Sequence, residues 1–187
     1  IHWQEMDGLI AAWRQRIAAL PCRFVLVRLE QGHQLLACLL AIWQLNRVAV
    51  LASQSPANLG LELVTDPHDD SIFGVIPALT DAADDTALLL FTSGSSGTPS
   101  AVVKTFPQLD AELALLESCW GQWVDDAVFA TTVSRHHMYG LPFSLLWPVV
   151  RGSPFYSDTI HYSQSLELLC QRFPLTLISS PVQLDHL

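Results

Sequence analysis

The sequence is poor in charged residues, and in basic residues above all. Asp, Glu, Lys and Arg make up 14% of the 187 residues, and nine bases against 18 acids give a formal net charge of −9. The bases are scattered singly along the chain. Nucleic-acid-binding proteins usually carry a clustered basic face, because neutralising phosphates supplies much of their affinity. A nucleic-acid partner or an anionic membrane surface is therefore disfavoured.

A long apolar run is also missing. The longest unbroken apolar stretch is Leu35–Trp43, far short of the ~20 residues that a membrane-spanning helix needs. The chain does not begin with a basic stretch followed by an apolar one, so no secretory signal is visible. We expect a cytoplasmic protein without a membrane span. Because the chain opens at Ile1 rather than at a methionine, we also expect it to be part of a longer polypeptide.

The four cysteines form no recognisable pair or cluster. Cys22, Cys38, Cys119 and Cys170 lie far apart, and no C-x-x-C pair or Cys/His cluster occurs. A zinc site and a disulfide framework are therefore both disfavoured. We expect buried thiols in a reducing compartment.

Apolar residues, in contrast, are plentiful at 50%, which is enough for the core of one compact domain or of a piece of a larger one. Apolar, β-branched stretches predict strands at Arg23–Leu29, Val48–Ala52, Ala87–Thr92, Ala101–Thr105, Ala127–Val133 and Leu175–Ser179, with weaker extended stretches at Ile72–Ile76 and Ser153–Ser157. Helical spacing predicts helices at His33–Asn46, Tyr139–Val150 and Ser163–Phe173, one that begins at Pro107 and carries Leu109, Leu113, Leu116 and Trp120 on one face, and one that begins at Pro181. This alternation predicts an α/β fold of layered sheets with helices on both faces.

A loop rich in glycine and hydroxyl groups follows one of the most apolar predicted strands. The stretch Phe91–Pro99 reads F-T-S-G-S-S-G-T-P. Glycines allow backbone N–H groups to converge on one point, and the hydroxyls add further donors, so the loop suits phosphate oxygens. It matches neither the P-loop nor the dinucleotide-binding fingerprint nor the nucleophile elbow of serine hydrolases. A plain surface turn is the alternative interpretation of such a loop.

The same string resembles the phosphate-binding signature of adenylate-forming enzymes, which include acyl- and aryl-CoA synthetases, peptide-synthetase adenylation domains and luciferases. The usual form of that signature is [YF]-T-S-G-[ST]-T-G-x-P-K-G, and the loop wraps the phosphates of ATP. The resemblance implies that ATP is bound by Thr92, Ser93, Gly94, Ser95, Ser96, Gly97 and Thr98.

One departure from the signature concerns charge. The family's usual lysine beside Pro99 is replaced by Ser100, and the next glycine by Ala101. An ammonium group at that place offsets charge as pyrophosphate departs, and a hydroxyl group does not. Lys104 is a candidate substitute if its side chain turns back toward the loop, and a solvated or locally paired lysine is the alternative.

A second stretch, S-R-H-H-M-Y-G-L from Ser134 to Leu141, follows another predicted strand. It resembles the H-x-Y-G segment at the acyl-substrate pocket of the same superfamily. The resemblance implies that His137 orients the substrate carboxylate as a catalytic residue and that Tyr139 and Gly140 line the pocket. Adjacent His136 and His137 are a poor metal site, because neighbouring side chains diverge and no third ligand is evident.

The resemblance implies a function and a domain organisation. Residues 1–187 are expected to be part of the larger N-terminal (AMP-binding) domain, without its C-terminal part, the magnesium ligands or the small C-terminal domain. The whole protein is then a ligase that uses ATP and Mg²⁺ to adenylate a fatty or aryl acid and forms a thioester with coenzyme A or an acyl carrier protein; the fragment alone is expected to be inactive. A degenerate module that binds acyl groups or carrier protein without chemistry is the main alternative. A serine hydrolase using Ser95 or Ser96 is a third, disfavoured because it lacks an elbow and an identified acid.

Overall fold

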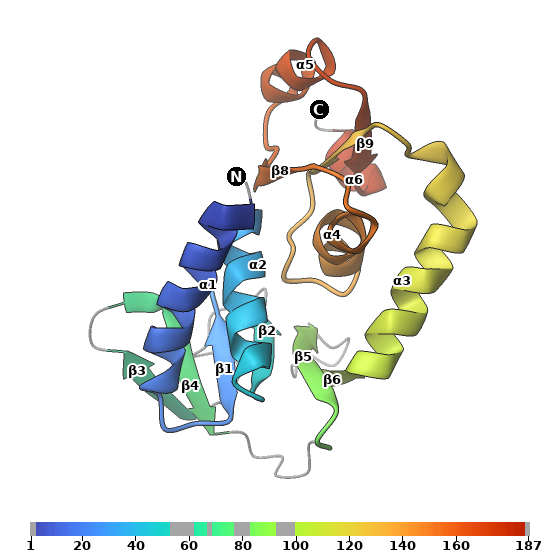
Figure 1. The fold of residues 1–187 in the computed structure, drawn as a ribbon. Coiled ribbons are helices and arrows are strands. Elements are labelled where there is room, and N and C mark those ends of the chain that lie inside the picture. Colours follow the sequence, from blue (N-terminus) through green and yellow to red (C-terminus); the bar gives the residue numbers. More distant parts are fainter. Residues whose placement is uncertain (1–2, 53–61, 67–68, 77–82, 93–99, 186–187) are drawn as a thin grey trace. The chain divides into compact units, whose positions relative to one another are not determined.

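The computed structural model describes residues 3–52, 62–66, 69–76, 83–92 and 100–185. The chain divides into two compact units. The first comprises residues 1–29 and 33–107, and the second comprises residues 30–32 and 108–187. Each unit contains one β-sheet with helices packed against it (Figure 1). The predicted α/β class is therefore confirmed.

The sheet of the first unit has six strands in the order β3-β4-β1-β2-β5-β6. Their bounds are β1 (Phe24–Val27), β2 (Val48–Ala52), β3 (Glu62–Asp66), β4 (Asp69–Ile76), β5 (Thr86–Thr92) and β6 (Ser100–Thr105). The three central strands β1, β2 and β5 run parallel, while β4 and β6 pair antiparallel to β1 and β5. The carboxyl ends of β1, β2 and β5 therefore lie at one edge of the sheet.

The central strands of this sheet are buried on both faces. Side chains alternate between the two faces of a strand, and both alternating sets are almost inaccessible to solvent. One set contains Phe24, Leu26, Val48, Val50 and Leu89, and the other contains Val25, Val27, Ala49, Leu51, Leu88 and Leu90. This explains why the strands read as continuous apolar runs in the sequence.

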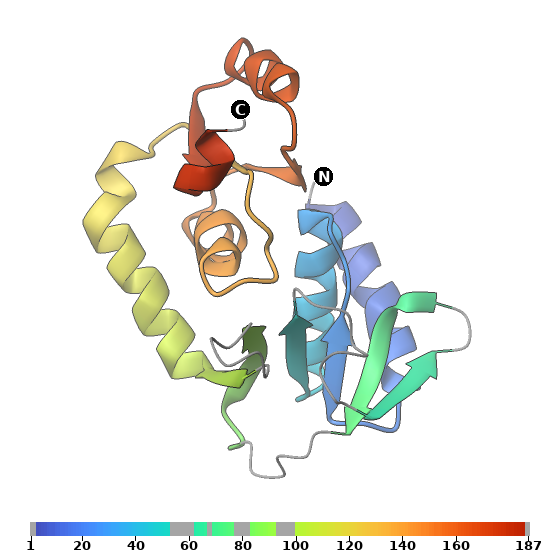
Figure 2. The same cartoon turned by 180° about the vertical axis from the view of Figure 1, so that it is seen from behind.

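Two helices, α1 (Trp3–Ala18) and α2 (Gly32–Gln44), lie side by side against one face of this sheet (Figures 1 and 2). The Trp13 indole Nε1 donates to Gln34 Oε1 at 3.2 Å and so links the two helices. Helix α1 was not predicted from the sequence, although Met6, Ile10, Trp13 and Ile17 recur at helical spacing and are buried. The short strand β3 was not predicted either.

The second unit contains a three-stranded parallel sheet in the order β8-β7-β9. Its strands are β7 (Val128–Thr131), β8 (Phe155–Thr159) and β9 (Leu175–Ile178), each close to a predicted strand. Its helices are α3 (Phe106–Trp120), whose first two residues belong to the first unit, η2 (Gly121–Trp123), η3 (Pro142–Leu146), α4 (Trp147–Arg151), α5 (Ser163–Cys170) and α6 (Pro181–Leu184).

Helix α3 buries most of the face that the sequence predicts. Leu109, Leu113 and Leu116 are buried, whereas Trp120, which the sequence places on the same face, is 46% exposed. Trp120 lies at the end of the helix, where its ring contacts Phe143 at a centroid distance of 5.6 Å. One ring face is therefore left to solvent.

The apolar helix predicted from Tyr139 onward begins with a π-helical segment, η3, which continues into α4. The Trp147 N–H donates to the Pro142 carbonyl, five residues back, as a π-helix requires. Pro148 supplies no N–H in the following turn. The helix ends at Gly152, whose φ of 75° is the left-handed conformation that glycine adopts without a Cβ penalty.

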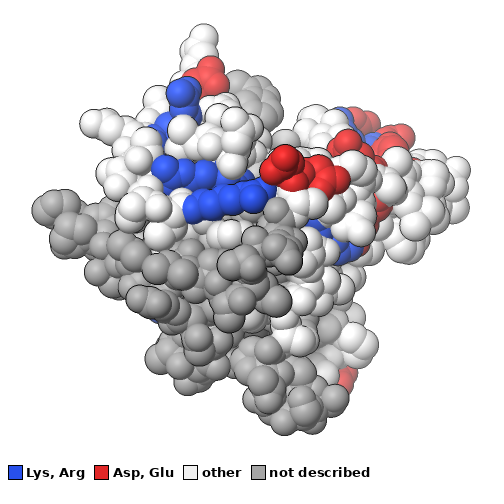
Figure 3. Space-filling model, turned by 90° about the horizontal axis from the view of Figure 1, so that it is seen from below, with Lys and Arg blue, Asp and Glu red and all other residues white. Residues whose placement is uncertain are grey.

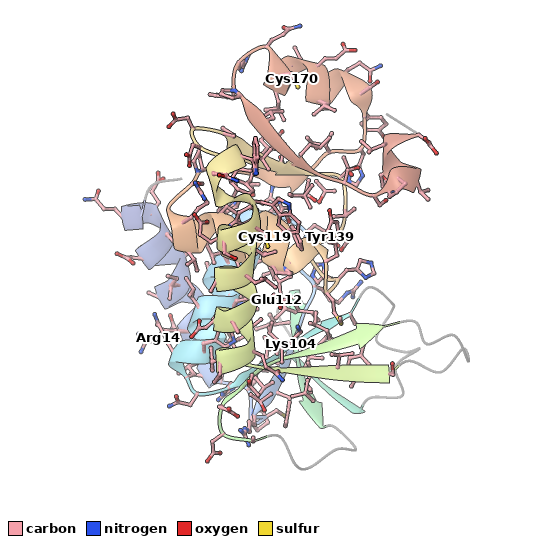
Figure 4. All side chains as sticks on the ribbon, turned by 90° about the vertical axis from the view of Figure 1, so that its right-hand side faces the viewer. Arg14, Lys104, Glu112, Cys119, Tyr139 and Cys170 are labelled. Carbon is pink, nitrogen blue, oxygen red and sulfur yellow. The ribbon has the colours of Figure 1, made fainter. Side chains whose placement is uncertain are left out.

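The cysteines depart in part from the expectation of buried thiols. Cys38 is buried and Cys22 is half-buried, whereas Cys119 and Cys170 are exposed on α3 and α5 (Figure 4). All four lie within the described residues, and none of them forms a disulfide there.

Candidate functional site

The predicted phosphate loop connects two strands of the first unit. Thr92 at the end of β5 pairs with Ser100 at the start of β6, so the two strand ends that flank the predicted loop lie side by side. They lie at the edge where β1, β2 and β5 end, and open α/β sheets bind ligands outside the carboxyl ends of their parallel strands. Of Thr92 only the backbone is described. The predicted phosphate-binding residues that lie outside the described part of the chain are Ser93, Gly94, Ser95, Ser96, Gly97 and Thr98.

Lys104 lies on β6, half-buried, with Leu88 as its partner in the neighbouring strand (Figure 4). Lys104 follows Ser100 by four positions, and a strand rises by ~3.3 Å per residue, so the two Cα atoms are about 13 Å apart. This distance exceeds the length of an extended lysine side chain. Lys104 therefore does not take the place of a lysine at position 100 itself, and its role in phosphate binding stays a prediction.

The second predicted motif follows β7, the central strand of the second unit. Residues 132–139 form turns between β7 and the helix that begins at Gly140. The Thr132 N–H donates to the Ile178 carbonyl of β9 at 3.0 Å, and Leu141 N–H donates to the His137 carbonyl at 3.0 Å. Because β7, β8 and β9 are parallel, the loops that follow them emerge at one edge of the sheet. The structure thus brings His137, Tyr139 and Gly140 together beside the end of β9.

The two adjacent histidines have opposite environments. His136 is only 3% exposed, and Ser134 Oγ accepts its backbone N–H at 3.2 Å and lies 3.4 Å from its Nδ1. Its buried Nε2 has no hydrogen-bond partner among the described residues. Burial lowers the pKa of His136, Glu30 raises it, and His137 and Arg135 lower it further. His136 is therefore neutral in the fold, whereas His137 is exposed to solvent.

Tyr139 is anchored to the end of β9. Its hydroxyl donates to the Ser179 carbonyl at 3.2 Å, and its ring lies 4.8 Å from that of Phe143. The Ser179 hydroxyl in turn lies 2.7 Å from Thr132 Oγ1, so the ends of β7 and β9 are joined by side chains as well as by backbone. Tyr139 as a whole is 43% exposed to solvent, and it lies at this edge (Figure 4).

Gly140 is required by packing. A Cβ at this position would collide with the Ser134 carbonyl oxygen. The Gly140 carbonyl accepts a hydrogen bond from Ser144 Oγ at 2.6 Å. The H-x-Y-G motif therefore ends in glycine here because the loop folds back on its own beginning.

Three residues of this loop edge were missed by sequence analysis, namely Ser134, Arg135 and Ser179. Arg135 is 2% exposed, and burial lowers its pKa to about 10, against the opposing effects of Asp158 and Glu30. From the sequence, an arginine beside two histidines is expected to be a solvated loop residue. Arg135 differs from a solvated arginine in being buried, which only the structure shows.

Charge and metal ligands are sparse on the described surface. On the face shown in Figure 3, basic and acidic side chains lie next to one another among many uncharged ones. Within residues 3–185, leaving out the undescribed gaps, no three His, Cys, Asp or Glu side chains are grouped as a metal would require. In the same part of the chain, every helix is too short or too polar to cross a bilayer.

A model of one protein family, described as AMP-binding enzyme, matches residues 14–184. Among curated proteins, the chain is similar to a medium-chain-fatty-acid–[acyl-carrier-protein] ligase of Moorena producens, with 35% identity over 74 residues that make up 40% of this chain and 12% of that protein. It is also similar to a sulfoacetate–CoA ligase of Cupriavidus necator, with 31% identity over 120 residues, 59% of this chain and 23% of that protein.

Solved structures share the fold at lower identity. The o-succinylbenzoate coenzyme A synthetase of Bacillus subtilis in complex with AMP superposes with a TM-score of 0.72 at 15% identity, covering 99% of this chain and 57% of that one. An acyl-CoA synthetase of Brucella canis superposes with a TM-score of 0.72 at 14% identity, covering 100% of this chain and 43% of that one. The chain thus spans less than two thirds of the length of each of these relatives.

Proposed function

The chain belongs to the AMP-binding enzyme family, and from this premise we propose that the whole protein is an acid–thiol ligase. It activates a small carboxylic acid with MgATP, forms an acyl-adenylate and pyrophosphate, and passes the acyl group to a thiol. Residues 1–187 are then part of the N-terminal domain, whose fold the chain shares with coenzyme A synthetases. The fragment alone is inactive in this proposal, because the magnesium ligands and the small C-terminal domain lie elsewhere in the protein.

The observation that carries the proposal is the family match over residues 14–184, which includes both signature stretches. In our proposal, Thr92–Thr98 bind the phosphates of ATP, and Lys104 adds positive charge to this site without taking the place of a lysine at position 100. His137 orients the carboxylate of the acid, and Tyr139 and Gly140 form the wall next to it. Support for this second site comes from the exposed faces of His137 and Tyr139 at the carboxyl edge of the parallel sheet.

Adenylation demands positioning and charge stabilisation more than proton transfer by a side chain, because a carboxylate attacks the α-phosphate in line with the departing pyrophosphate. The described residues fit that demand. The loop edge of the second unit offers an exposed imidazole, hydroxyl groups and rigid backbone anchors, and no pair of carboxylates set up for acid–base work is needed.

The substrate that we propose is a fatty or aryl acid, and the acceptor thiol belongs to coenzyme A or an acyl carrier protein. Relatives of this chain bear names that specify a medium-chain fatty acid with an acyl carrier protein and sulfoacetate with coenzyme A. We place this activity in the cytoplasm, since it uses ATP and none of the four cysteines forms a disulfide.

A second candidate function is a degenerate module that binds acyl groups or a carrier protein without chemistry. The observation that favours it is Ser100, which stands where the family's signature has a lysine. Without that ammonium group, charge that develops on the departing pyrophosphate is less well stabilised.

Pyrophosphate exchange separates the two candidates. The whole protein is incubated with ATP, Mg²⁺, labelled pyrophosphate and, one at a time, a panel of fatty, aryl and short dicarboxylic acids. Acid-dependent incorporation of label into ATP supports the ligase. No incorporation with any acid, together with saturable binding of an acylated carrier protein, supports the module and contradicts the ligase.

A further inference from the structure

The pairing of strand β8 with β7 is interrupted by a shift in register, and two backbone carbonyl groups lie at that interruption. In its pairing with β7, Phe129 faces Phe155 and Thr131 faces Thr159, so two residues along β7 correspond to four along β8. The extra residues bulge between these pairs. The carbonyl groups of Tyr156 and Ser157 lie in that bulge, where the regular ladder is interrupted.

The buried side chain of Arg135 supplies both donors. Its Nη2 donates to the Tyr156 carbonyl at 2.7 Å, and its Nη1 donates to the Ser157 carbonyl at 2.8 Å. A planar guanidinium offers several N–H groups in a fixed fork and so satisfies two acceptors at once, which fixes its orientation as well as its position.

Gly32 makes room for this guanidinium. A Cβ on Gly32 would lie 3.1 Å from Arg135 Cζ, 3.2 Å from Arg135 Nε and 2.9 Å from the Phe155 ring. The Arg135 Nε has no hydrogen-bond partner among the described residues. A charge that is 2% exposed is expensive to bury, and the two hydrogen bonds from the guanidinium to backbone carbonyl groups offset part of that cost.

The loop that holds His137 is thus anchored on both sides. Arg135, two residues before His137, is attached to β8, and Tyr139, two residues after it, donates to the Ser179 carbonyl beyond β9. Ser134 closes the loop internally, because its hydroxyl accepts the His136 N–H and its carbonyl packs against Gly140. The exposed His137 lies between these two anchors.

We propose that Arg135 is a positioning residue, which clamps the loop of residues 134–140 to the β8 bulge and thereby holds His137 in place for the carboxylate of the acid. The functional half of this statement rests on the ligase function proposed above. The clamp itself rests on the hydrogen bonds and burial of Arg135. It predicts that loss of the fork loosens this loop and weakens recognition of the acid, while binding of ATP is unaffected.

Hydrogen–deuterium exchange of the whole protein tests the clamp. In Arg135→Gln, amide exchange in residues 134–141 and 155–159 is expected to rise by about 100-fold or more, because two hydrogen bonds from a charged donor are lost. Exchange in β5 is expected to stay unchanged. Arg172→Gln, the same substitution at an exposed arginine, is the matched control and should leave the loop as it is.

Kinetics of pyrophosphate exchange test the functional half. Arg135→Gln is expected to raise KM for the acid about ten-fold and to leave KM for ATP unchanged. If both KM values rise together, the positioning role is contradicted. If the protein shows no acid-dependent exchange at all, the ligase function fails, and the hydrogen-exchange result still decides the clamp.

The Gly32→Ala variant keeps the proposal testable should Arg135→Gln not fold. This variant retains the charge of Arg135, but the new methyl group on residue 32 crowds the guanidinium. Local amide exchange in residues 134–141 is therefore again expected to rise. Unchanged amide exchange in this loop, in a folded variant of either kind, overturns the clamp. A rise that is equal throughout the chain overturns it as well.

Discussion

Gly140 lies directly against Ser134, so that a single methyl group on Gly140 would meet the Ser134 carbonyl oxygen. The contact joins the first and last residues of the loop that carries His136 and His137. Because the collision would be with backbone rather than with a flexible side chain, a substitution at Gly140 displaces the loop itself.

We predict that Gly140→Ala destabilises the protein by about 1–3 kcal/mol, the usual cost of inserting a methyl group where no space exists. The matched control is Gly8→Ala in α1, where a new Cβ meets nothing within 4 Å. That variant is expected to be more stable by about 0.5–1 kcal/mol, since alanine favours a helix interior over glycine. Denaturant unfolding measures both. Equal stabilities of the two variants would contradict the packing argument.

The buried His136 makes stability depend on pH. Burial lowers its pKa in the folded state from the ordinary 6.5, so the unfolded chain binds a proton more readily than the folded one. The contribution of neutral His136 to the free energy of unfolding is therefore fully present above about pH 6.5, and it is lost as pH falls below that value toward the folded pKa. We predict that His136→Asn flattens this dependence in denaturant unfolding measured across the range. His161→Asn, at an exposed histidine, should retain the slope of the natural protein.

Glu117 on α3 holds two residues of α4. The Trp147 Nε1 donates to Glu117 Oε2 at 2.7 Å, and Arg151 Nη1 donates to both carboxylate oxygens at 2.6 and 2.7 Å. These partners lower the pKa of Glu117, the Trp147 hydrogen bond most of all, against the opposing effect of desolvation.

We predict that Glu117→Gln lowers the thermal unfolding temperature near neutral pH. Because the folded pKa lies below the ordinary 4.5, the contribution of the charge is present above about pH 4.5 and disappears as pH falls through the folded pKa. The difference between variant and natural protein should shrink accordingly in acid. Glu167→Gln on the exposed face of α5 is the control, and an equal loss there would refute the role of the network.

Ser100 is the position where charge is missing from the phosphate signature. We predict that Ser100→Lys in the whole protein raises acid-dependent pyrophosphate exchange by about ten-fold, because an ammonium group beside the loop stabilises the departing pyrophosphate. Ser118→Lys on the exposed surface of α3 adds the same charge elsewhere. If both variants behave alike, the effect is not local to the loop.

His137 is the residue that we place next to the acid. His137→Ala is expected to reduce pyrophosphate exchange about 100-fold, the usual effect of misplacing a reacting group, without changing the unfolding temperature, since the side chain is exposed. His161→Ala provides the control. Retention of full exchange in His137→Ala would remove this residue from the proposed pocket.

Most elements of the fold were predictable because their signals are local. The strands β1, β2, β5 and β9 and the helices α2 and α3 follow from apolar runs and from helical periodicity within short windows. Periodicity places Trp120 on the same face as Leu109, Leu113 and Leu116 but does not tell that it is exposed at the end of the helix. The helix α1 was missed despite its buried stripe of Met6, Ile10, Trp13 and Ile17.

The candidate site divides in the same way. The two motifs, their order after buried strands and the glycine at position 140 follow from the sequence alone, because they depend on neighbours a few residues apart. Three-dimensional packing is needed to bury His136 while leaving His137 exposed, and to bring Arg135 to carbonyl groups more than 20 residues away. The Arg135 contacts depend on the register of β8 against β7, because the bulge in β8 contains both carbonyl groups that accept from the guanidinium.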